Sequence, residues 1–115
     1  METTTLKENI INNKLTDNLT DIQDACKRFG VKQLYVFGSI TNSRFNTQSD
    51  VDFLVSFKKS AYTHFFDNYM DLHYRLAEIM HHKIDLITED ALLNEPNPYF
   101  NKNVDNAKIL VFDGQ

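Results

Sequence analysis

Several features are scarce in this 115-residue chain, and each scarcity excludes a class of protein. Cys26 is the only cysteine, so no internal disulfide can form, and we expect this side chain in the core. Twelve basic against sixteen acidic residues give a net charge of −4, which argues against a broad electrostatic grip on nucleic acid. No apolar run approaches the length of a membrane span, and residues 1–5 lack the layout of a signal peptide. We therefore predict a cytoplasmic protein without strong nucleic-acid binding.

Glycine is also scarce, with only three in the chain. Gly30 is placed to stop a helix, and Gly114 lies in the tail. Gly38 instead precedes Ser39 between an apolar strand and a helical turn, where backbone amides can approach an anion closely. An isolated Gly-Ser is more often an ordinary turn. The GxxxxGK[ST] and GxSxG patterns are missing, so neither a P-loop nor a serine-hydrolase elbow is supported.

The length fits one domain over residues 1–115, with residues 1–16 as a polar lead-in that is frayed or partly helical. Periodicity predicts the order helix, strand, turn, strand, helix, strand, helix, strand. The expected fold is α/β (α+β), a small mixed sheet flanked by helices. The predicted helices cover about 17–29, 65–80 and 98–107, a helical turn covers 39–44, and the strands cover 32–37, 50–57, 83–88 and 108–112.

Two carboxylates, Asp50 and Asp52, open the second predicted strand. Residues two apart in a strand point to the same face, so the two charges repel unless a cation lies between them. Asp-x-Asp also occurs in surface turns and calcium loops, but the glycine and terminal glutamate of an EF-hand are missing here. The pair also leads directly into the apolar run 53–55. We therefore interpret it as a site for a divalent metal.

Asp85 is a lone carboxylate between Ile84 and Leu86 in the third predicted strand. Two interpretations stay open. It is either an edge-strand charge that points to water, or the third carboxylate of a cluster with Asp50 and Asp52. Mg²⁺ prefers oxygen ligands, and two such ions roughly 3.5–4 Å apart can activate an attacking oxygen and stabilise a leaving one.

The longest predicted helix has one broad apolar face, which we expect to be core rather than a platform for stacking bases. His64 and His73 are expected to pack on or near this face. His81 and His82 end the helix and do not share a face, so a zinc site from this pair is not expected. The predicted core face consists of Phe65, Phe66, Tyr69, Met70, His73, Leu76, Ala77 and Met80.

Together these motifs resemble a known family. Gly38-Ser39, nine intervening residues and Ser49-Asp50-Val51-Asp52 are similar to the glycine-serine/SDxD pattern of the DNA polymerase β-like nucleotidyltransferases. The small size, the strand around Asp85 and the ending 97–112 resemble the minimal nucleotidyltransferase branch. The resemblance covers the chain from about residue 18.

The resemblance implies Mg²⁺-dependent transfer of a nucleoside monophosphate, AMP from ATP, to a hydroxyl group with release of pyrophosphate. It also implies an antitoxin whose partner is a HEPN-domain toxin, modified on a tyrosine. Two Mg²⁺ ions would be held by the aspartates, and the third carboxylate would also help to deprotonate the acceptor. The implied nucleotide-binding residues are Gly38, Ser39 and Ser49, and the implied catalytic and metal-binding residues are Asp50, Asp52 and Asp85.

Two departures from the family pattern stand out. Ser43 occupies the position of an expected glycine, and His81-His82 replace a glycine before the third strand. The first departure favours an alternative, a non-catalytic module that neutralises its partner by forming a complex. A small-molecule nucleotidyltransferase ranks lower because the chain lacks a second substrate-holding domain. The apolar helices are also compatible with a homo-oligomer or a toxin interface.

Overall fold

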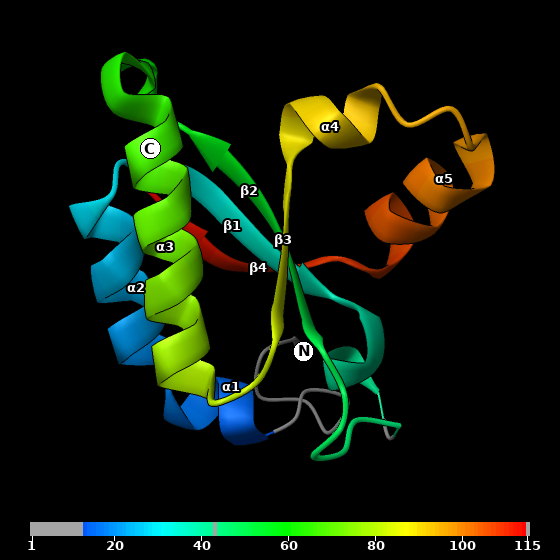
Figure 1. Cartoon of the computed structure of the whole chain (residues 1–115). Coiled ribbons are helices and arrows are strands. Elements are labelled where there is room, and N and C mark those ends of the chain that lie inside the picture. The colour runs from blue at the N-terminus through cyan, green and yellow to red at the C-terminus, as the bar shows by residue number, and fades with distance from the viewer. Residues whose placement is uncertain (1–12, 43, 115) are drawn as a thin grey trace.

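The computed structural model of this chain describes residues 13–42 and 44–114, and its centre is a four-stranded sheet in the order β3-β2-β1-β4 (Figure 1). The predicted mixed α/β architecture is confirmed, because β1 is antiparallel to both β2 and β4, whereas β2 and β3 are parallel. The strands are β1 (Val31–Phe37), β2 (Val51–Phe57), β3 (Ile84–Thr88) and β4 (Ile109–Asp113).

The register of the sheet brings the predicted polar residues to one end of it. Asp52, the second residue of β2, pairs with Phe37 at the end of β1 on one side and with Asp85 of β3 on the other. Directly paired residues of parallel strands point to the same face. Asp52 and Asp85 are therefore neighbours on one face, next to the turn that follows β1.

One face of the sheet is covered by α2 (Leu19–Arg28) and α3 (Phe65–Met80), which lie side by side (Figure 1). The larger core lies between these helices and the sheet. Cys26 is fully buried there, as predicted. Gly30 ends α2 with a φ of +75°, a conformation that a residue with a side chain adopts only at a cost. The fully buried large side chains of this core include Ile22, Leu34, Val36, Phe53, Val55, Leu72, Leu76 and Met80.

The opposite face carries α4 (Glu89–Leu93) and α5 (Pro98–Ala107) (Figure 1). A second apolar cluster joins them to the sheet through Leu92 of α4 and Val104 of α5, which pack with Phe37 and Leu54. Asp52 and Leu54 alternate along β2 with the residues that face the larger core, so the carboxylate lies on the side of α4 and α5.

Three shorter elements complete the described chain: α1 (Asn13–Asp17), η1 (Gly38–Thr41) and η2 (Lys59–His64). The lead-in prediction falls mostly on residues 1–12, outside the described part, but Leu15 of α1 is fully buried in the core. Asn18 occupies the N-cap of α2, so this helix begins slightly later than the predicted start at about residue 17. Among the described residues, no helix has both the length and the apolarity to cross a membrane.

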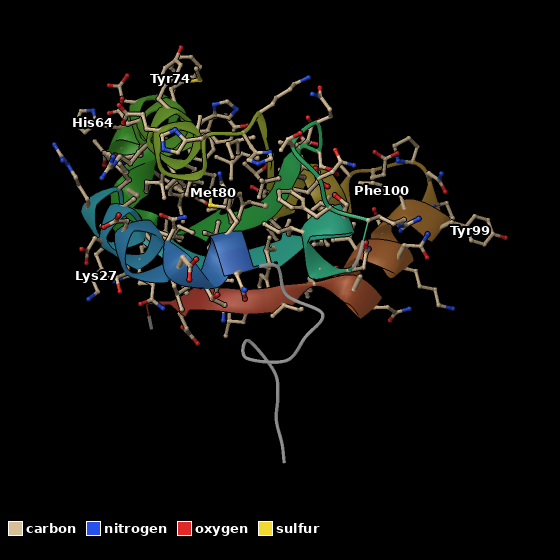
Figure 2. The ribbon with its side chains drawn as sticks, turned by 90° about the horizontal axis from the view of Figure 1, so that it is seen from below. Lys27, His64, Tyr74, Met80, Tyr99 and Phe100 are labelled. Atoms are coloured by element: carbon tan, nitrogen blue, oxygen red, sulfur yellow. The ribbon has the colours of Figure 1, made fainter. Side chains whose placement is uncertain are left out.

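The predicted core face of α3 was partly wrong. Phe66 is 71% exposed and Phe65 is 37% exposed, whereas the buried residues of the helix are Leu72, Leu76, Ile79 and Met80. Burial is therefore concentrated in the C-terminal half of α3. Figure 2 shows Met80 directed toward the sheet and Tyr74 directed outward. His64, expected to pack, is exposed instead.

Candidate active site

Gly38 brings the turn after β1 directly against a carboxylate. Its φ is +81°, and a Cβ added at this position would overlap Oδ2 of Asp52. Only glycine satisfies both the backbone conformation and the close approach. The turn is braced by Thr41, whose hydroxyl donates a 2.6 Å hydrogen bond to the Gly38 carbonyl, and by the Asn42 amide, 3.0 Å from the Ser39 carbonyl oxygen. The predicted Gly-Ser turn is therefore in contact with the second carboxylate of the Asp-x-Asp pair.

Asp52 is a partly buried carboxylate whose ionisation is affected by its neighbours. Burial, together with the charges of Asp85 and Asp50, raises the pKa of its carboxyl group to about 6. Asp50 lies one residue before β2 and is exposed, and Asp85 is exposed on the edge strand β3. Asp85 therefore faces water, as the first interpretation from the sequence has it, and its charge also acts on Asp52. The cluster of three carboxylates stays a prediction.

The donors at this end of the sheet fit a hard divalent cation. They are carboxylate oxygens, and a cation would offset both the burial and the repulsion between carboxylates that raise the pKa of Asp52. Within residues 13–42 and 44–114, no group of three His, Cys, Asp or Glu side chains is arranged so that it could hold a metal ion by itself. Mg²⁺ usually takes one or two carboxylates and completes its shell with phosphate and water.

Ser49 and Asp50 are carried by a loop that is attached to the start of β3. His82 Nδ1 donates a 2.7 Å hydrogen bond to the Ser49 carbonyl oxygen, because a carbonyl can only accept. The His82 ring also packs on Phe45, with 4.8 Å between centroids. The Ser49 hydroxyl accepts from the Asn46 amide at 3.0 Å, which leaves its proton available to a ligand. The departure at Ser43 lies outside the described residues.

Sequence reasoning missed His82 because it was seen only as a helix end. The departure from the family pattern at His81-His82 was the available signal. His81 adopts a φ of +56°, so it occupies the left-handed position at the end of α3 that glycine usually fills. His82 then turns back toward the loop.

Asp85 lies between two residues that α3 contacts. Tyr69 Oη donates a 2.6 Å hydrogen bond to the Leu86 carbonyl oxygen, and His73 Nε2 donates at 3.1 Å to that of Ile84. Burial and the charge of Asp85 raise the pKa of Tyr69. His73 was expected only to pack, and its hydrogen bond could not be inferred from helix periodicity.

An open apolar cavity of about 420 Å³ lies beside β3, next to Asp85 in the chain. Its aromatic wall comes from the first turns of α3, the region that was predicted to be core. Such exposed apolar surface is a common feature of sites that contact another molecule. The lining residues are Phe65, Phe66, Tyr69, Leu86, Ile87, Thr88 and Ala91.

With the Gly-Ser turn and the carboxylates in one place, the match to a known family is decisive. Residues 20–115 match the family described as "Polymerase beta, Nucleotidyltransferase". The chain belongs to this family. It is therefore a nucleotidyltransferase, and the fold and the enzyme class implied by the sequence are confirmed.

Relatives of this nucleotidyltransferase include two proteins of Methanocaldococcus jannaschii. It is 32% identical over 84 residues to "Putative protein adenylyltransferase MJ1379", which covers 73% of this chain and 80% of the relative. It is 30% identical over 86 residues to "Putative protein adenylyltransferase MJ0128", which covers 74% of this chain and 81% of the relative.

Solved structures share the fold of this nucleotidyltransferase at lower identity. "Structure of putative minimal nucleotidyltransferase" matches with a TM-score of 0.68 and 20% identity, covering 89% of this chain and 97% of that one. "Crystal structure of the toxin-antitoxin with AMP-PNP" matches with a TM-score of 0.59 and 18% identity, covering 85% of this chain and 75% of that one. Both likenesses concern the fold.

Proposed function

We propose that this nucleotidyltransferase transfers AMP from ATP to a hydroxyl group of a protein, in a reaction that requires Mg²⁺. The contact of Gly38 with Asp52, and the pairing of Asp52 with Asp85, carry this proposal. They support it because a turn whose backbone amides could bind phosphate lies against carboxylates that a cation would stabilise. The names of the two archaeal relatives support adenylyl transfer to protein.

Each side of the site has its own role in the donor complex. The backbone after β1 and the Ser39 hydroxyl would bind the triphosphate, with the Ser49 hydroxyl as a further donor. Asp50 and Asp52 would hold Mg²⁺, two ions in the full complex, with Asp85 as a further ligand. When bound, Mg²⁺ neutralises phosphate charge and stabilises the in-line displacement.

Asp85 would act on the acceptor side. Its exposed carboxylate would accept the proton of the acceptor hydroxyl, whose oxygen attacks the α-phosphorus of ATP. The bond from that phosphorus to the bridging oxygen breaks, and pyrophosphate leaves with the bond's electron pair. The products are AMP-modified protein and pyrophosphate, so atoms and charge balance.

The acceptor in this proposal is a tyrosine of a HEPN-domain toxin, and the chain acts as its antitoxin in the cytoplasm. A small enzyme has little surface for gripping a polymer template, whereas the open aromatic cavity beside β3 suits a polypeptide. The structural neighbour described as a toxin-antitoxin with AMP-PNP supports this choice of partner and donor.

The test is the intact mass of a small helical protein encoded beside this chain, after incubation with the enzyme, Mg²⁺ and each nucleoside triphosphate in turn. We expect a mass gain of AMP units with ATP, abolished by EDTA and by Asp50→Asn. A tight complex that silences the partner with no mass change would contradict transfer and establish the binding antitoxin instead.

A further inference from the structure

Asp85 is exposed, although the proposed function requires its carboxylate to be held in a precise position. It lies on β3, which is an edge strand with β2 as its single neighbour in the described sheet. An edge strand has half of its backbone groups outside the ladder. Hydrogen bonds from outside the sheet can therefore add to the hold of β2 on the backbone around Asp85.

Two side chains of α3 supply the missing hydrogen bonds. Tyr69 Oη lies 2.6 Å from the Leu86 carbonyl oxygen and His73 Nε2 lies 3.1 Å from that of Ile84, so the bonds flank Asp85 on both sides. Four residues of a helix rise about 6 Å, and two residues of a strand rise about 6.6 Å. The i, i+4 pair on the helix thus matches the i, i+2 pair on the strand.

The surroundings of Tyr69 and His73 indicate that these side chains serve the two hydrogen bonds and do not only fill space. The Tyr69 ring is stacked on Phe65, with 6.1 Å between centroids and 23° between planes, which fixes the direction of the phenol. His73 keeps its Nδ1 buried without a hydrogen-bond partner, an arrangement that costs stability. An apolar side chain at this position would avoid that cost but could not bond to Ile84.

We propose that Tyr69 and His73 are positioning residues that hold β3 from α3 and so keep the Asp85 carboxylate beside Asp52 for activation of the acceptor. This inference rests on the proposed function. Neither residue touches the reacting atoms. Gly38, Asp50 and Asp52, which would bind the donor and its metal, take no part in these two bonds, and Asp85 would add only a further ligand on that side.

The variants Tyr69→Phe and His73→Leu each remove one bond, and each has a matched control. Tyr74→Phe removes a phenol hydroxyl from the same helix at a side chain that is 62% exposed. His73→Gln keeps an N–H donor at a similar reach, so it should restore what His73→Leu loses. All variants are compared for AMP transfer to the protein partner, affinity for AMP-PNP with Mg²⁺, and amide exchange of residues 84–88.

We expect Tyr69→Phe and His73→Leu to slow transfer about tenfold, as one lost hydrogen bond would. Exchange in β3 should accelerate by a similar factor, while AMP-PNP affinity stays within about twofold. Tyr74→Phe should change none of these, and His73→Gln should recover most of the loss. Wild-type transfer in both loss variants, or an equal loss of AMP-PNP affinity, would overturn the positioning role.

The same comparison separates this inference from the proposed function. If the wild-type protein transfers no AMP, the proposed function fails. Amide exchange of residues 84–88 then decides whether the two hydrogen bonds fix β3. Faster exchange in Tyr69→Phe than in Tyr74→Phe supports that hold, whereas equal exchange in the two variants overturns it.

Discussion

At the scale of one residue, the Asp52 carboxylate lowers the stability of the metal-free fold when it is ionised, and it is also a group that we propose to hold Mg²⁺. Burial and two neighbouring carboxylates raise the pKa of its carboxyl group from 3.8 to about 6, so the metal-free native state binds this proton more tightly than the unfolded chain does. The stability associated with this group is therefore greatest at low pH and is lost as the pH rises from about 4 to about 6.

We predict that Asp52→Asn raises the melting temperature of the metal-free protein at pH 7.5 by a few degrees. The amide removes a charge that is unfavourable in the folded state, although partial exposure moderates the effect. At pH 4 the two proteins should differ little. Melting curves in EDTA at both pH values check this, and a lower melting temperature for Asp52→Asn at pH 7.5 would contradict it.

At the scale of elements, the loop before β2 depends on one side chain from the end of α3. The hydrogen bond from His82 to the Ser49 carbonyl, 2.7 Å long, spans 33 residues of sequence and is joined by the packing of His82 on Phe45. This attachment holds the backbone next to Asp50. A flexible loop would have to be ordered each time nucleotide binds.

We predict that His82→Ala destabilises the protein by about 1 kcal/mol, the typical net worth of a hydrogen bond. It should also speed amide exchange in residues 44–50 and weaken nucleotide binding. His64→Ala, at an exposed histidine, is the control and should change none of the three quantities. Amide exchange followed by mass spectrometry checks this, and a loop as protected as in the wild type would refute the anchoring role.

Local patterns predicted the elements well, but not the faces that they present. Gly30 follows the end of α2 and Pro98 begins α5, and both signals are local, because glycine readily adopts a positive φ and proline has its φ fixed. The Phe65-Phe66 pair was predicted to be core because it falls on the broad apolar face of the helix. In the structure these residues begin α3, where burial is slight, and no local signal reports where a helix runs past its sheet.

At the scale of the whole molecule, the site depends on long-range pairing. Spacing alone brought Asp50 and Asp52 together, since they are two residues apart. The contact of Asp52 with Gly38 requires β1 and β2 to pair, and its place beside Asp85 requires the parallel register of β2 and β3. Periodicity contains no information on strand order, so the residues left a cluster with Asp85 as one of two interpretations, and the family resemblance favoured it.

Titration of AMP-PNP into the protein, with Mg²⁺ or with EDTA, tests the donor site most directly because it needs no partner. Two glycine variants form a matched pair. Gly38 and Gly30 both have positive φ, and an added Cβ would meet Asp52 in the first and the Ala61 side chain in the second. Both Gly→Ala changes should cost about 1–2 kcal/mol of stability through strain.

We predict that the wild type binds AMP-PNP only with Mg²⁺. Gly38→Ala and Asp52→Asn should each weaken binding by about 10- to 100-fold, as the loss of a charge-assisted contact would. Gly30→Ala should bind like the wild type despite its strain. If Gly38→Ala and Asp52→Asn bind AMP-PNP as the wild type does, the turn and the carboxylate are not the nucleotide site.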